Sequence, residues 1–189
     1  MPTPVRYVAL LAAVNVGRRQ MKMERLREVI RAVGFDGVGT YIQTGNLFFT
    51  APASTTADSV QRQIEQAIST EFGFGVETVL HTVADFARIV EGGPFSADPL
   101  TPDERQLIVF LRRPPAALPP LPAPSSNGSF SIIGADAPTD PRALYVQISD
   151  ARTWARTSPA EMKRLLGPMT TTGRWRHTSE RILAAAQGA

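Results

Sequence analysis

The stretch VGTYIQTGNLFFT, from Val38 to Thr50, predicts two short β-strands joined by a tight turn. Val38 to Gln43 and Leu47 to Thr50 are rich in β-branched and aromatic residues, which favour strands. Thr44-Gly45-Asn46 separates them, and Gly and Asn tolerate the positive φ angles of hairpin connections. We therefore expect a β-hairpin in the first half of the chain.

The segments on either side of the hairpin predict one helix and one strand each. Apolar residues recur at helical spacing before and after it, and a glycine at a helix C-cap position, Gly34 and then Gly73, ends each pattern. Short apolar runs from Val5 to Leu11 and from Val76 to Leu80 predict the outer strands. The order βαββαβ over residues 1–81 is that of a ferredoxin-like unit, or α/β-plait.

The rest of the chain predicts a connector and a second, irregular unit. Thr82 and Asp85 form a capping box that opens a connecting helix and loop over residues 82–105. The apolar run QLIVFL, from Gln106 to Leu111, predicts a buried strand that starts the second sheet. A second, incomplete α/β-plait unit is expected over residues 106–189, so the predicted fold class is α+β with two ferredoxin-like units.

Within the second unit a proline-rich loop takes the place of the first helix. Six of the twelve residues from 113 to 124 are proline, which excludes a regular helix there. Phe130 to Ile133 and Ala143 to Ile148 predict a pair of strands. Ser158-Pro159 predicts the start of a short helix that ends near Gly167, and a terminal helix runs through Ile182, Leu183 and Ala186.

Composition indicates a folded protein of a reducing compartment. Hydrophobic residues make up 43% of the chain and charged residues 20%, unlike the balance of a disordered protein. There is no cysteine, hence no disulfide, thiolate nucleophile or cysteine metal site. The N-terminus does not resemble a signal peptide, and no apolar run is long enough to cross a membrane. We expect a soluble, cytoplasmic protein without a membrane partner.

Charge is concentrated near the two ends of the chain. The net charge is only +3, but residues 18–31 hold six basic and two acidic residues, and residues 152–181 hold seven and two. Basic clusters on one face attract polyanions such as nucleic acid. An ordinary solvated surface explains the same counts, so both interpretations stay open.

Three polar clusters lie between the predicted elements and are candidates for ligand binding. The first follows the first strand, where a glycine and two guanidinium groups near a helix start suit a phosphate or carboxylate. Its members are Asn15, Gly17, Arg18 and Arg19. Alternatively, Asn15 and Gly17 only shape the turn.

The second cluster is the hairpin turn, with Gln43 and Asn46. Hairpin geometry alone accounts for Asn46, which leaves Gln43 as the residue of this turn that hairpin geometry does not explain. The third cluster combines hydroxyl groups, a guanidinium and an aromatic ring, as used to bind a nucleic-acid backbone and stack a base: Thr171, Thr172, Arg174 and Trp175. Alternatively, Trp175 is a core anchor and Thr178 an N-cap.

The sequence nominates no catalytic residue, no cofactor and no metal site. His81 and His177 are the only histidines, and they lack metal-ligand spacing. The clustered carboxylates lie beside prolines in predicted turns. Whether the protein is an enzyme is left open.

The chain resembles the family of bacterial proteins known as domain of unknown function 1697. The matching stretches are YVALLAAVNVG from Tyr7 to Gly17, TYIQTGN from Thr40 to Asn46, and Thr171 to Trp175. The family pattern L-R-G-I-N-V-G-G differs here, because Ala12 and Ala13 replace its Arg and Gly. At the last site Thr172-Gly173-Arg174-Trp175 stands where the family has T-R-N-W. The resemblance implies a pair of ferredoxin-like units and no established activity.

Three hypotheses for function follow. The first is a binding protein for an anionic ligand, either nucleic acid or a phosphorylated metabolite, that uses the first and third clusters together. The second is an enzyme that acts on a small molecule in a polar cleft between the two units. The third is a protein–protein interaction module that docks a partner on its sheet or proline-rich loop.

Overall fold

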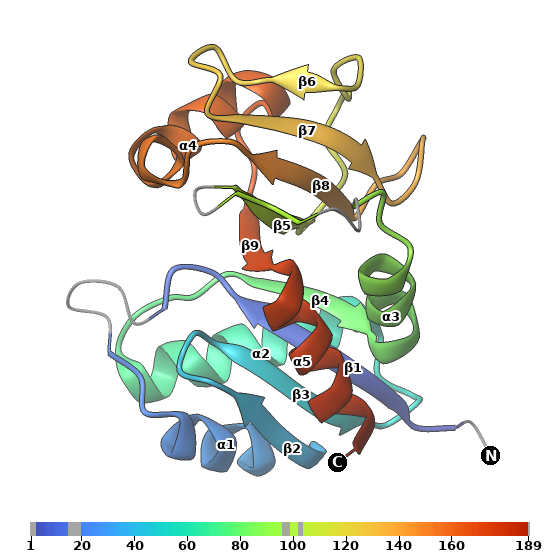
Figure 1. Ribbon diagram of the computed structural model, residues 1–189. Helices are drawn as coiled ribbons and strands as arrows, with labels where there is room; N and C mark the ends of the chain where they lie inside the picture. The colour runs from blue at the N-terminus through green and yellow to red at the C-terminus, as the bar shows by residue number, and fades with distance from the viewer. Residues whose placement is uncertain (1–2, 15–19, 96–98, 102–103, 189) are drawn as a thin grey trace. The chain divides into compact units, whose positions relative to one another are not determined.

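Two antiparallel sheets with helices packed on them make up the computed structural model (Figure 1). It describes residues 3–14, 20–95, 99–101 and 104–188. The chain forms two compact units, one of Met1–Arg88 with Glu180–Ala189 and the other of Ile89–Ser179. The predicted division differs, because it makes residues 82–105 a connector and keeps the terminal helix in the second half.

The first sheet has the strand order β2-β3-β1-β4, with every neighbouring pair antiparallel. Helix α1 lies between β1 and β2 in the sequence and α2 between β3 and β4, which is the order of elements expected from the sequence. The bounds are β1 Val5–Leu11, α1 Met23–Ala32, β2 Asp36–Tyr41, β3 Asn46–Ala51, α2 Ala57–Phe72 and β4 Thr78–Thr82.

Alternating residues of β1 serve the two faces of this sheet. Tyr7, Ala9 and Leu11 belong to the core that the sheet shares with α1 and α2. Val8 and Leu10 are fully buried on the other face. There Arg6 donates from Nε to the carbonyl of Ala186 at 2.5 Å, which holds the end of α5 (Arg176–Gly188) against the first unit. The helix crosses in front of the sheet in Figure 1.

The predicted helix ends are confirmed at two places. The Thr82 hydroxyl accepts a hydrogen bond from the backbone N–H of Asp85 at 3.0 Å and so caps α3 (Val83–Glu91). Gly73 follows α2 with a φ of 73° in the left-handed region, which a residue with a side chain adopts only at a cost. Local sequence signals therefore set where α3 begins and where α2 ends.

The second sheet has the order β6-β7-β8-β5-β9, also with antiparallel neighbours. Apart from the short edge strand β6, this order repeats that of the first sheet. Residues 112–122 form no helix, and Leu118 from this loop packs on the core under α4. The bounds are β5 Arg105–Leu111, β6 Ala123–Pro124, β7 Phe130–Ala135, β8 Ala143–Ile148, α4 Ala151–Leu166 and β9 Thr171–Trp175.

The predicted start of α4 was wrong, because the helix begins two turns earlier and contains Pro159. Asp150 caps it by accepting from the N–H groups of Arg152 at 2.9 Å and Thr153 at 3.1 Å. Trp154 in the first turn packs edge-on against Phe130, with ring centroids 4.8 Å apart. A cap and a tertiary contact thus stabilise the turns before the proline.

The segment from Thr171 to Trp175 is a strand, although its sequence predicted a polar connection before the terminal helix. It pairs with β5 from Leu107↔Trp175 to Leu111↔Thr171. Thr and Trp favour strands, and β5 offers them a free edge. Among the residues that the structure describes, no helix has the length and apolar character needed to span a bilayer.

Candidate functional site

The second predicted cluster, the hairpin turn, lies at the end of β1. The backbone N–H of Leu11 donates to the carbonyl of Gly45 at 2.8 Å, so the hairpin turn lies against the end of this strand. A Cβ atom on Gly45 would lie 2.5 Å from Cγ2 of Val14. The turn therefore packs on the residues that lead directly into the first cluster.

Within the turn Asn46 has a structural role. It is fully buried, and its Nδ2 donates to the carbonyl of Tyr41 and to the hydroxyl of Thr44, both at 3.0 Å. These bonds close the turn, as hairpin geometry led us to expect. Gln43 and Thr44 are exposed beside it. Of the predicted residues in this turn, Gln43 is the one that faces solvent.

Two residues near this point have backbone angles that side chains rarely adopt. Ala13 has a φ of 53° and Ile42 a φ of 48°. Ile42 is β-branched, for which the left-handed region is especially unfavourable, and its side chain is 49% exposed. Such angles persist where the surrounding structure imposes them, often at binding sites. We add Ala13 and Ile42 to the candidate site.

A sequence signal for Ala13 exists. The family pattern has Gly at this position, and Gly is the residue that a positive φ favours. No comparable signal marks Ile42, because nothing in the stretch TYIQTGN distinguishes the residue with the unusual angle.

The first turn of α1 lies on the chain directly after the first cluster. Its N-cap residue, Lys22, is exposed and makes no side-chain capping bond. The first N–H groups of a helix carry a partial positive charge and attract anions when no side chain caps them. Lys22 adds a full positive charge at the same point.

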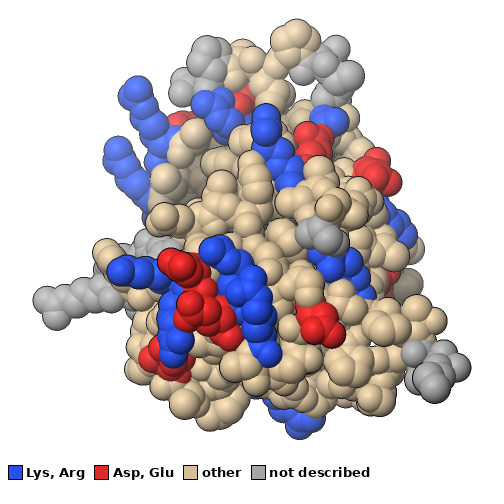
Figure 2. Space-filling view, turned by 90° about the horizontal axis from the view of Figure 1, so that it is seen from below, with Lys and Arg blue, Asp and Glu red and all other residues tan. Residues whose placement is uncertain are grey.

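The other basic side chains of α1 are engaged in contacts on their own unit. Arg25 bonds both oxygens of Glu71, at 2.6 and 2.9 Å, and these bonds together with one to Glu28 raise the pKa of Arg25. Arg27 donates to the hydroxyl of Thr40, and Arg31 to the carbonyl of Val38. Figure 2 shows basic and acidic side chains next to one another on this face. The face is mixed in charge rather than uniformly positive.

The first cluster itself, Asn15, Gly17, Arg18 and Arg19, lies outside the described residues. Its two flanks are described, and both are anchored in the first unit. Val14 is 6% exposed and Met21 is 3% exposed, and both belong to the core under α1 and α2. Of these two flanking residues, Val14 is the one shown beside the hairpin turn, because a Cβ on Gly45 would approach its side chain.

The third cluster forms β9, and its side chains divide between the two faces of the second sheet. Trp175 packs on the core of that sheet with Leu107, which agrees with the alternative interpretation of Trp175 as a core anchor. Thr172 and Arg174 point to the opposite face, because neighbouring strand residues alternate. The Arg174 guanidinium and the Trp175 ring are thus not brought together.

On its face of β9, Arg174 turns back onto its own strand. Its Nη1 donates to the hydroxyl of Thr172 at 2.7 Å and to the carbonyl of Gly173 at 2.9 Å. Burial lowers the pKa of Arg174 to about 10, so the group stays charged at neutral pH. Thr171 lies on the other face, with Trp175.

The described residues contain no group of three or more His, Cys, Asp or Glu side chains placed to hold a metal ion. The candidate site consists of a turn, the end of β1 and the start of α1. Its described part offers backbone groups, the Lys22 ammonium and the Gln43 amide to a ligand, and Glu65 and Glu77 line the hollow beside Ala13.

Comparison with known proteins agrees with the family resemblance. The family model described as "Protein of unknown function (DUF1697)" matches residues 5–128, which include β1, the hairpin and β5. The chain belongs to the DUF1697 family. No curated protein matches it.

A solved structure of similar fold is that of the conserved bacterial protein SP0830 from Streptococcus pneumoniae. The two chains are 17% identical and superpose with a TM-score of 0.71, over 98% of this chain and 99% of the streptococcal one. At that identity the match shows that this DUF1697 protein shares the fold along its whole length.

Proposed function

We propose that this DUF1697 protein binds a small anionic ligand, a phosphorylated metabolite, at the end of β1. The observation that carries the proposal is the Leu11–Gly45 hydrogen bond, which joins the hairpin turn to the strand that precedes Asn15, Gly17 and the two arginines. In this proposal two sequence motifs far apart in the chain contribute to one site.

The chemistry at this point suits a phosphate group. The start of α1 has no side-chain cap, and Lys22 stands at its N-cap position. Arg18 and Arg19 lie on the chain within four residues before Lys22. Helix N–H groups together with cationic side chains are a recurrent way to bind phosphate. The exposed Gln43 adds an amide that hydrogen-bonds a sugar or another polar part of the ligand.

A compact ligand is favoured over nucleic acid by the contacts that the three arginines of α1 make. Nucleic-acid binding draws on many cationic side chains along a surface. On α1, Arg25 is paired with two carboxylates, and Arg27 and Arg31 bond groups of β2. Near the start of α1, Lys22 is thus the basic residue of the described chain for which the structure shows no such contact.

A thermal-shift screen of nucleotides, sugar phosphates and short oligonucleotides tests the proposal. A ligand present at a hundred times its Kd should stabilise the protein by about 2.7 kcal/mol. The double variant R18A/R19A should lose this shift, whereas R152A/R156A, which removes the same charge from exposed positions of α4, should keep it. A shift that survives R18A/R19A would contradict the proposed site.

Two further outcomes identify the other functional hypotheses. Binding of oligonucleotides with an affinity that falls steeply with salt would favour nucleic acid as the ligand. Consumption of the added compound, followed by phosphorus NMR, would indicate an enzyme.

We also propose that both units are ferredoxin-like. The first has the element order βαββαβ and the strand order β2-β3-β1-β4, which support the assignment. The second repeats this strand order as β7-β8-β5-β9, with the proline-rich loop and β6 where the first helix would stand. An experimental structure in which α1 and α2 do not pack on the same face of the first sheet would contradict the ferredoxin-like assignment.

A further inference from the structure

The strands at the edges of the two sheets direct backbone groups away from their sheets. In an antiparallel pair, alternate residues turn their N–H and C=O groups toward the partner strand and away from it. Leu11 uses its N–H toward β3, since it donates to Gly45. Its partner on β4 is Thr78, so the backbone N–H and C=O of Thr78 point away from β1, to the side of β4 that has no partner strand in the sheet.

Helix α2 occupies both of these groups. The N–H of Thr78 donates to Oε1 of Glu65 at 2.8 Å, and the C=O of Thr78 accepts from Nε2 of Gln61 at 2.6 Å. Gln61 and Glu65 are one helical turn apart, which places their side chains on the same side of α2. Together they offer Thr78 one acceptor and one donor, as a residue of an added strand would.

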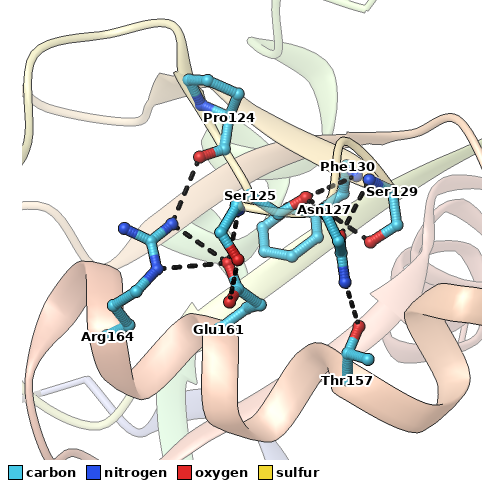
Figure 3. A network of polar contacts seen from close by, with 9 residues as sticks. Pro124, Ser125, Asn127, Ser129, Phe130, Thr157, Glu161 and Arg164 are labelled. Atoms are coloured by element: carbon cyan, nitrogen blue, oxygen red, sulfur yellow. Dashed lines mark hydrogen bonds and ion pairs between the residues drawn. The ribbon is translucent and has the colours of Figure 1, made fainter.

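The three other edge strands each have one outward carbonyl bonded by an arginine. Arg31 of α1 donates to the carbonyl of Val38 on β2 at 3.4 Å. Arg164 of α4 donates to that of Pro124 on β6 at 3.4 Å, as Figure 3 shows. Pro124 also has no N–H to offer. Arg174 donates to the carbonyl of Gly173 on β9 at 2.9 Å. At Thr78 the donor and the acceptor are both occupied.

We propose that these side chains close the sheet edges to added strands, and that Gln61 and Glu65 prevent β4 from pairing with β4 of a second copy of the chain. The sequence of β4, TVLHT, is rich in β-branched residues, and its outward residues are Thr78, Leu80 and Thr82. An antiparallel pair centred on Leu80 would place Thr78 of one copy opposite Thr82 of the other. Such a two-fold arrangement is self-complementary, which is why the second copy is the partner expected.

The double variant Q61A/E65A tests this proposal, with Q63A/Q66A as the matched control. The control removes two polar side chains of the same helix that bond only other residues of α2. Sedimentation equilibrium should give Q61A/E65A a self-association constant at least ten times that of the wild type and of the control. Hydrogen exchange should slow at the Leu80 and Thr82 amides as protein concentration rises.

Adding T78P to Q61A/E65A provides a second measurement, because proline has no N–H for a partner strand and its substitution leaves the bonds to β1 intact. It should reverse the association. If the double variant does not fold, the single variants Q61A and E65A should show the same increase in smaller degree. Folded variants that sediment like the wild type at every concentration would overturn the proposal.

Discussion

Leu11 and Gly45 are joined by a 2.8 Å hydrogen bond between the backbone N–H of the first and the carbonyl of the second, and the Gly45 Cα faces the Leu11 side chain closely. A Cβ atom at position 45 would lie 2.8 Å from the Leu11 Cβ atom, and the residue has a φ of 76°. The hairpin turn therefore depends on glycine for two independent reasons.

The substitution Gly45→Ala should lower the free energy of unfolding more than Gly73→Ala. Both variants adopt an unfavourable φ, which costs about 1 kcal/mol. Only position 45 adds an overlap, worth a further 1–3 kcal/mol or so, because nothing lies within 4 Å of a Cβ at Gly73. Urea denaturation of the two variants measures the difference. Equal losses would contradict the close packing of the turn on β1.

Ala13→Gly should stabilise the protein, because glycine relieves the cost of the positive φ. The gain is about 0.5 kcal/mol, the relief being partly offset by the greater freedom of glycine in the unfolded chain. The neighbouring Ala12 lacks a positive φ, so Ala12→Gly should destabilise by about 0.5–1 kcal/mol. Chemical denaturation compares the two, and destabilisation by both would show that the backbone at Ala13 is not strained.

Much of the first unit was predictable because its signals are local. The spacing of apolar residues, Gly73 and the Thr82–Asp85 capping box each act within a few residues, and each gave an element or a boundary that the structure contains. The Thr44-Gly45-Asn46 turn also gave the hairpin. The contact between this turn and Leu11 was not predictable, since it depends on how β3 pairs with β1.

The errors lie where tertiary contacts outweigh local preference. Pro159 suggested a helix start, but the Asp150 cap and the packing of Trp154 begin α4 earlier. The sequence predicted a connection from Thr171 to Trp175. The segment instead pairs with β5 and forms an edge strand. Within the candidate site, the alternation of side chains along β9 separates Arg174 from Trp175, which their adjacency in the sequence did not indicate.

Asp150→Ala should lower the free energy of unfolding by about 1 kcal/mol, because it leaves the first N–H groups of α4 without a cap. Asp140, an exposed carboxylate between β7 and β8, provides a control of equal charge. Thermal or urea denaturation compares D150A with D140A. If α4 instead started at Ser158, D150A would be as stable as D140A.

Glu161 should make the protein sensitive to acid. Its side chain accepts hydrogen bonds from the backbone N–H and hydroxyl of Ser126 and from Arg164, and these lower its pKa to about 2. Figure 3 shows the contact with Arg164. A carboxyl group whose pKa is lowered on folding adds stability above its ordinary pKa of 4.5, and this is lost as the pH falls toward 2.

The variant E161Q should therefore lose less stability than the wild type between pH 5 and 2, which are the limits that the two pKa values of about 4.5 and 2 suggest. At neutral pH it should be the less stable protein. Glu91→Gln, at an exposed position of α3, serves as the control. If E161Q and the wild type lost the same free energy of unfolding between pH 5 and 2, the role given to Glu161 would be wrong.

The most direct test of the proposed binding site is a titration of ¹⁵N-labelled protein followed by amide chemical shifts. Inorganic phosphate is added first, followed by the compound with the largest thermal shift. We expect saturable shifts at Ala13, Lys22, Met23 and the turn from Gln43 to Gly45, with the Ser126–Gly128 turn of the second unit unchanged. Unchanged amide chemical shifts in the hairpin turn, or equal changes in both turns, would contradict the proposed binding site.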